Sequence, residues 1–143
     1  MFFGQYQHRL ENKGRVSIPK KFRALLKVGA VLTKGLDGCL FLFPKTTWAQ
    51  IINKIVQTPI TQKDARAFSR HLTYGAFEVE FDKLGRILIP GALRKYAQIR
   101  KGVVIAGALD RVEIWDRDVF EKYYRQIEKS TDLIAERLSP LGI

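Results

Sequence analysis

The sequence predicts an α+β, β-rich fold built from two tandem half-repeats that pack into one pseudo-dimeric domain. Three observations predict it. The chain has 143 residues, which suits one compact domain. The phrase ENKGRVSIPKKFR at residues 11–23 returns as DKLGRILIPGALR at residues 82–94, a shift of 71. Short apolar runs bounded by glycine and proline, typical of strands, recur in both halves. We therefore expect halves at residues 1–72 and 73–143, each too small to bury a good core alone.

Each half is expected to begin with two strands joined by a glycine turn. The stretch YGAFEVEF at residues 74–81 alternates apolar and polar residues, as a half-buried strand requires. FGQYQHRL at residues 3–10 is its less regular copy. Gly14 and Gly85 mark the turn, because glycine tolerates positive φ. A second short strand follows, RVSI in the first half and RILI in the second.

A helical turn and two further strands are expected next in each half. Pro19 and Pro90 end the second strands and suit the first position of a helical turn. The following strands read AVLT and CLFLF in the first half, and VVIA and VEIW in the second. Turns at residues 35–38 and 108–111 join them.

Helices are expected to close both halves. Thr47 and Gln50 form a capping-box pattern, which predicts a helix that begins after Thr47. A second helix at residues 61–72 bridges to the second half. The last helix covers residues 118–138, and its apolar stripe faces the core or a neighbouring subunit. The residues after it form a frayed tail.

The net charge of +11 is unevenly distributed. Residues 1–70 hold 13 Lys/Arg and 3 Asp/Glu, whereas residues 71–143 hold 12 and 11. A basic half suggests a polyanionic partner, since each phosphate that a cation neutralises releases condensed counterions. The other interpretation is that the charge serves solubility alone.

Other function classes lack their usual signals. No run of about 18 apolar residues is present, so we expect no membrane partner. Cys39 stands alone, so neither an internal disulfide nor a cysteine metal cluster is expected. No catalytic triad order, metal-ligand spacing or phosphate-binding glycine loop appears. We expect a cytoplasmic protein that is not an enzyme and has no catalytic site, metal, cofactor or small-molecule substrate.

Four stretches resemble the MraZ family of bacterial transcriptional regulators. They are FFGQYQHRLENKGRVSIPKKFR, LTKGLDGCLFLFP, FDKLGRILIPGALR and VEIWDRDVFEKY, and the similarity covers residues 1–125. The resemblance implies an AbrB-like swapped-hairpin β-barrel in which both hairpins come from one chain. It also implies a cyclic homo-oligomer, an octamer-like ring, associated with the nucleoid. Such proteins bind double-stranded DNA at short repeated boxes upstream of the division and cell-wall gene cluster.

The family's Asp-x-x-x-Arg motif occurs once in each half. The second copy is intact as Asp82 to Arg86. In the first copy Glu11 replaces the aspartate, and Arg15 matches. Glutamate keeps the charge but adds a methylene, so a looser geometry is expected around Arg15.

The predicted DNA-binding residues lie in and after the two turns, where arginine forks and lysine charges can grip DNA. They are Lys13, Gly14, Arg15, Lys83, Gly85 and Arg86, with Glu11 and Asp82 as the acids that orient the arginines. In a second interpretation each acid and arginine form a structural pair within one motif, Glu11 with Arg15 and Asp82 with Arg86. The basic residues that follow the first motif are interpreted first as solvating a helix and second as widening the positive field. They are Lys20, Lys21, Arg23 and Lys27.

Two alternative functions stay open. One is an AbrB-type antitoxin of a toxin–antitoxin pair, although such proteins usually carry one motif and a disordered toxin-binding tail. The other is a non-specific nucleic-acid-binding accessory protein, for example one that acts on ribosomal RNA.

Overall fold

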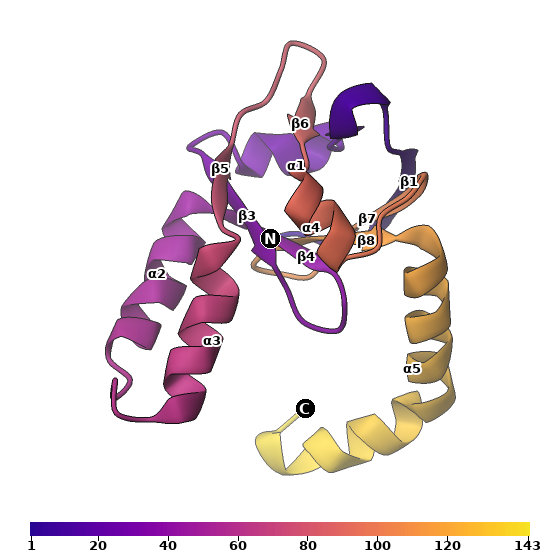
Figure 1. Ribbon diagram of the computed structural model, residues 1–143. Coiled ribbons are helices and arrows are strands. Elements are labelled where there is room, and N and C mark those ends of the chain that lie inside the picture. The colour runs from indigo at the N-terminus through magenta and orange to yellow at the C-terminus, as the bar shows by residue number, and fades with distance from the viewer.

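A computed structural model describes residues 1–143 and shows a β-rich α+β fold (Figure 1). In chain order its elements are β1 (Gln5–Arg9), the 3-10 helix η1 (Asn12–Gly14), β2 (Arg15–Ser17), α1 (Lys20–Leu25), β3 (Ala30–Lys34), β4 (Leu40–Pro44), α2 (Lys45–Val56), α3 (Lys63–Tyr74), β5 (Phe77–Val79), β6 (Arg86–Leu88), α4 (Gly91–Tyr96), β7 (Gly102–Gly107), β8 (Val112–Asp116), α5 (Arg117–Leu138) and the 3-10 helix η2 (Ser139–Leu141). The strand and helix order expected from the repeats is therefore present in both halves.

The strands form a six-stranded antiparallel sheet and a separate two-stranded ribbon. The sheet order is β1-β7-β8-β4-β3-β5, and β2 pairs with β6 in the ribbon. The two halves exchange strands: β1 pairs with β7, with Tyr6 opposite Ile105, and β5 pairs with β3, with Phe77 opposite Leu32. Neither half could therefore complete its sheet alone.

The expected closed barrel is not present. The sheet is open, with β1 and β5 as its edges. The strands β2 and β6 pair only with each other, through three residue pairs, so the ribbon lies apart from the sheet instead of closing it. The α+β, β-rich class is confirmed, and the AbrB-like barrel is not.

The main core lies between the ribbon, the two short helices α1 and α4, and one face of the sheet. The side chains of Val16 and Ile87 in the ribbon are fully buried there, together with Phe22 of α1 and Leu93 of α4. Successive side chains of a strand point to opposite faces. In β4, Leu40 and Leu42 enter this core, while Phe41 and Phe43 enter a second one.

The second core explains why the stretch CLFLF is apolar without interruption. Cys39, Phe41, Phe43, Val104 and Trp115 form it on the other face of the sheet, where residues of α2 and α5 cover them. A strand that is buried on both faces has no solvent side to mark with polar residues.

The helix boundaries correct one prediction and shift two others. The helix α2 begins at Lys45, directly after Pro44 ends β4, and it has no side-chain cap. The capping box at Thr47 is therefore wrong, because this threonine already lies inside the helix. The helix α3 lies two residues later than expected at both ends. The helix α5 begins one residue early, capped by the Asp116 carboxylate, which accepts from the N–H groups of residues 118 and 119.

The two repeated turns lie at one end of the molecule. Figure 1 shows η1 and the β5–β6 connection at the top of the view, opposite the tips of α2 and α3 and the C-terminal half of α5. The chain contains no helix whose length and apolar character would let it cross a membrane.

Candidate nucleic-acid interface

The ribbon places the two repeated turns side by side. Val16 lies opposite Ile87, its equivalent at the repeat shift of 71, so the ribbon is centred on one pair of equivalent residues. Two equivalent backbone bonds extend the pairing. The Ile18 N–H donates to the Gly85 carbonyl at 3.0 Å, and the Ile89 N–H donates to the Gly14 carbonyl at 2.9 Å. A pseudo-twofold axis thus relates the two turns.

The two turns share two backbone hydrogen bonds and the conformation of their glycine, but Lys13 has a positive φ of 65° and its equivalent Leu84 does not. In the second turn the Asp82 N–H donates to the Arg86 carbonyl at 3.0 Å, and the Gly85 N–H donates to the Asp82 carbonyl at 3.0 Å. The first turn repeats both bonds, from Glu11 to Arg15 at 2.7 Å and from Gly14 to Glu11 at 3.2 Å. Both glycines have positive φ, 77° and 76°. Glycine at these positions permits a turn that other residues enter only with strain.

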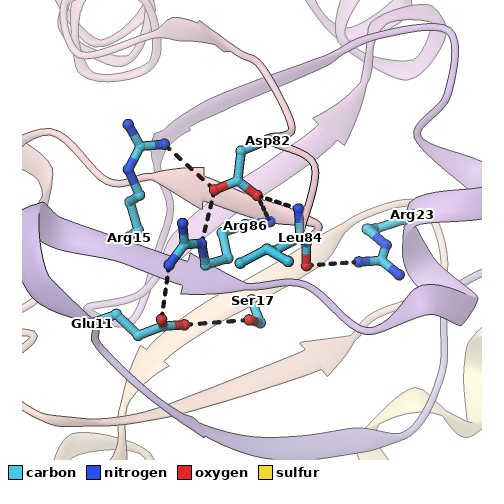
Figure 2. Close-up of polar contacts among 7 residues, drawn as sticks. All are labelled: Glu11, Arg15, Ser17, Arg23, Asp82, Leu84 and Arg86. Atoms are coloured by element: carbon cyan, nitrogen blue, oxygen red, sulfur yellow. Dashed lines mark hydrogen bonds and ion pairs between the residues drawn. The ribbon is translucent and has the colours of Figure 1, made fainter.

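The side chains of the turns interact across the pseudo-twofold axis. Arg86 Nε donates to Asp82 Oδ2 at 2.8 Å, and Arg86 Nη1 donates to Glu11 Oε1 at 3.0 Å. Arg15 Nη1 lies 3.7 Å from the same Asp82 Oδ2. Figure 2 shows both guanidinium groups directed at this one oxygen. The pair predicted between Asp82 and Arg86 is confirmed, and the one predicted between Glu11 and Arg15 is wrong.

The ribbon register explains why Glu11 crosses to the other half. Ser17 lies opposite Arg86 in the ribbon. The Glu11 carboxylate uses both of its oxygens. Oε2 accepts from Ser17 Oγ at 3.4 Å, and Oε1 accepts from Arg86 Nη1 (Figure 2). Because Glu11 bonds to Ser17, its carboxylate lies beside Arg86, the residue opposite Ser17, instead of beside Arg15.

The aspartate of the second turn is held more tightly than the glutamate of the first. Asp82 Oδ1 accepts from the backbone N–H groups of Leu84 and Arg86, both at 2.9 Å. These bonds, led by the one from the Arg86 N–H, hold the pKa of the Asp82 carboxyl below its usual range. Hydrogen bonds to Asp82 and then Glu11 raise the pKa of the Arg86 guanidinium. The second turn is thus a rigid acid–arginine unit, and Arg15 is held more loosely.

The charged residues predicted for the interface lie on this one surface, whereas Gly14 and Gly85 are buried next to Arg94 and Arg23. The side chains of Arg15 and Arg86 are 38% and 26% exposed, so both guanidinium groups keep N–H donors for a ligand. Lys13 and Lys83 are exposed at the tips of the turns. The structure brings together the two arginines and the two acids, and it places the lysines around them. Such a surface offers planar forks and point charges to phosphates or guanine edges.

Two further arginines, which the sequence interpretation missed, support the turns. Arg23 of α1 lies against Gly85, and its Nη1 donates to the Leu84 carbonyl at 3.5 Å (Figure 2). Arg94 of α4 lies against Gly14, where an added Cβ would be 3.0 Å from its guanidinium carbon. Interpreting Arg23 as a solvating residue was therefore wrong. The sequence does contain a signal for this supporting role, because Arg23 and Arg94 are equivalent in the repeat.

Cys39 and His71, whose side chains are of chemically reactive types, make contacts within the fold. Cys39 is fully buried, and Sγ donates to the Leu36 carbonyl at 3.3 Å. His71 Nε2 lies 2.7 Å from the Gly35 carbonyl oxygen. No three side chains of the metal-ligating types His, Cys, Asp and Glu lie close enough together to hold an ion.

The chain is similar in sequence to known proteins. A family model described as "MraZ protein, putative antitoxin-like" matches residues 1–71 and again residues 72–139, which confirms the tandem repeat. Three of the similar proteins are named transcriptional regulator MraZ. They come from Caldanaerobacter subterraneus subsp. tengcongensis, Thermoanaerobacter pseudethanolicus and Moorella thermoacetica, and they are 49%, 50% and 47% identical over 100% of both chains.

Proposed function

Because the chain belongs to the MraZ family, whose matched relatives are named transcriptional regulators, we propose that it regulates transcription by binding DNA in a sequence-specific way. It binds double-stranded DNA at short repeated boxes upstream of the division and cell-wall gene cluster. It acts there as a ring-shaped homo-oligomer associated with the nucleoid in the cytoplasm.

One observation carries the proposal, namely the shared placement of Arg15 and Arg86 at Asp82 Oδ2. Two arginine forks on one exposed surface are suited to guanine edges in the major groove. Asp82 and Glu11 orient the forks, and the exposed Lys13 and Lys83 contact the phosphates on either side. Gly14 and Gly85 are buried, and their positive φ sets the turns that present the arginines to the duplex.

The proposed domain organisation follows from the strand exchange. Residues 1–72 and 73–143 form one pseudo-dimeric domain, in which β1 and β5 each complete the sheet of the other half. The pseudo-twofold axis of the ribbon then meets the local twofold symmetry of a DNA duplex, so each turn addresses one side of a box.

The helices outside the sheet support an assembly of several chains. Val56 and Ile60 at the tip of the α2–α3 hairpin are 74% and 81% exposed. Exposed apolar side chains also occur along α5, at Leu133, Ile134 and Leu138. Contiguous apolar surface marks protein–protein contacts, and we propose that these side chains form such contacts between subunits. In a ring, neighbouring subunits engage neighbouring boxes, and the effective concentration of the linked sites multiplies a weak single contact.

Genome-wide footprinting of the tagged protein tests the target, and gel shifts with the identified box test its specificity. We expect occupancy at repeated boxes before the division and cell-wall genes, and stronger binding to the box than to a scrambled duplex. Equal affinity for both duplexes would leave a non-specific accessory role. Stronger competition by structured RNA than by the box would place the function on RNA.

The description of the family as "putative antitoxin-like" supports a second candidate. An antitoxin would bury an apolar segment against its toxin, and the exposed leucines and isoleucine of α5 offer one. Co-purification of a small protein from the native host, in a fixed ratio to this chain, would support that function. The doubled motif favours the regulator.

A further inference from the structure

We propose that the groove between α1 and the β5–β6 turn is a binding site for a backbone phosphate of the DNA, and that it serves the second turn only. This inference rests on the proposed function. It adds a contact site outside the two motifs and makes the two turns unequal in how they hold the duplex.

The groove is lined by cations from two separate segments. Its volume is about 570 Å³. Lys20, Arg23 and Lys27 enter it from α1 and the residues that follow α1, and Lys83 enters it from the turn. Asp82 is the acid in its lining, and that carboxylate is already bound by Arg86. The groove therefore has an excess of positive charge beside the proposed base-reading arginines.

Arg23 gives the groove a fixed donor. It is half-buried against Gly85 and anchored by the Leu84 carbonyl. A guanidinium has five N–H donors, so the anchored group keeps others for an oxyanion. A donor that is already positioned loses less freedom when the ligand binds.

The lysines of the groove have no ion-pair partner in the protein. None of the protein's salt bridges includes Lys20, Lys27 or Lys83. On α1, Lys20 lies three residues before Arg23, a spacing at which like charges on a helix repel. Lys27 lies beyond the end of α1 and lines the same groove. Lys21, on the same helix, instead lies over the Phe3 ring at 3.5 Å and is not part of the lining. A phosphate would relieve the repulsion, whereas solvation alone gives no reason for the convergence.

The repeat gives the first turn three cations at the equivalent place, where the groove of the second turn has four. At the shift of 71, the positions of Lys20, Arg23, Lys27 and Lys83 are occupied by Gly91, Arg94, Gln98 and Asn12. Only the arginine is retained. Lys13 and Lys95 occupy the positions of Leu84 and Ala24, so the first turn has fewer cations and has them at other positions. The two turns therefore grip the backbone differently although their arginines are equivalent.

The salt dependence of binding tests the site. The variant is Lys20→Gln/Lys27→Gln, and the control is Lys54→Gln/Lys129→Gln, which removes the same charge from exposed positions on α2 and α5. Loss of this phosphate contact should reduce the slope of log K against log salt by about 1, while the preference for the box over a scrambled duplex is kept. The control should keep the wild-type slope. Equal slopes for the two variants would overturn the proposal.

Phosphate ethylation interference on a single-box duplex then locates the contact. Interference should disappear at one phosphate on one side of the box in the groove variant and persist in the control. An unchanged pattern would also overturn the proposal, as would a loss seen with structured RNA but not with the box. If the wild-type protein shows no box preference, the proposed function itself fails. If the preference is present but the groove variant behaves as the control, only this inference fails.

Discussion

Arg86 and Glu11, 75 positions apart in the chain, are joined by an ion pair in which Arg86 Nη1 lies 3.0 Å from Glu11 Oε1. This contact links the two halves of the molecule, because Asp82 of the second half holds the same guanidinium through its Nε. Arg15, the equivalent of Arg86 in the repeat, has one acidic partner at 3.7 Å. The two arginines thus share one proposed role in binding, but Arg86 has two close acidic partners and Arg15 has one more distant partner.

Alanine substitutions should separate these roles. We expect Arg15→Ala and Arg86→Ala each to raise the dissociation constant for a box duplex about ten- to a hundredfold, since each removes one arginine fork. Only Arg86→Ala should also lower the urea midpoint of unfolding, because it leaves two acids without their shared partner. Fluorescence anisotropy and urea denaturation measure the two effects, with the exposed Arg137→Ala as the control. An equal loss of stability in Arg15→Ala would contradict the assignment.

The second turn should tolerate no side chain at Gly85. At φ +76° an alanine is strained, and its Cβ would overlap Arg23 Nη1 and displace that side chain from the Leu84 carbonyl. Gly4 is the matched control, because it has φ +89° but only Tyr6 atoms at 3.9 Å near the position of an added Cβ. We expect Gly4→Ala to lose about 1–2 kcal/mol from backbone strain alone.

Gly85→Ala should lose more stability than Gly4→Ala and should weaken DNA binding, which Gly4→Ala should leave intact. Urea denaturation and gel shifts on both variants check this. If both variants lose the same stability and both bind the box as the wild-type protein does, the position of Arg23 does not depend on the absence of a side chain at residue 85.

The Asp82 charge should stabilise the fold in a pH-dependent way. The pKa of its carboxyl is lower in the folded protein than its ordinary value of 3.8, first because the Arg86 N–H donates to it. A lowered pKa stabilises the folded state above the ordinary value, and this contribution is lost as the pH falls through the folded value. Asp82→Asn keeps an oxygen for the backbone bonds but removes the charge.

We therefore expect Asp82→Asn to have a lower urea midpoint than the wild-type protein at pH 7, and the difference to shrink as the pH falls below about 3.8. Denaturation curves from pH 7 to pH 3 measure it, with the exposed Asp132→Asn as a control that should show no such trend. A difference that stays constant over this range would show that the charge does not contribute.

The sequence predicted the two turns and the short strands β2 and β6 because their signals are local. A glycine–arginine step followed by an aliphatic run and proline specifies a turn, a short strand and a helical turn at Pro19 or Pro90 wherever it occurs. The crossing of Glu11 to Arg86 could not be predicted in this way. It depends on the register that sets Ser17 opposite Arg86, and segments far apart in the chain fix that register together.

The remaining errors have the same origin. Thr47 has the composition of a helix cap, but Pro44 ends β4 and the chain enters α2 at once, so packing of the strand decides the boundary. The open sheet follows from the pairing of β2 with β6 alone, which no single segment encodes. Arg23 lies among other basic residues in the sequence, and only its equivalence to Arg94 in the repeat sets it apart from them.

Cys39 should be unreactive in the folded protein although it is the only thiol in the chain. Its side chain is fully buried, and burial, with the nearby Glu113 carboxylate as a lesser cause, raises the pKa of the thiol above its usual range. Alkylation needs the thiolate, so both the charge state and the access oppose it. We expect iodoacetamide at pH 8 to leave the native protein unmodified and to label it once in denaturant, as measured by intact mass. Ser130→Cys, which adds a thiol at an exposed position of α5, should take up one label in the native state. Stoichiometric labelling of the native wild-type chain would mean that β4 opens readily and that the second core is not closed as described.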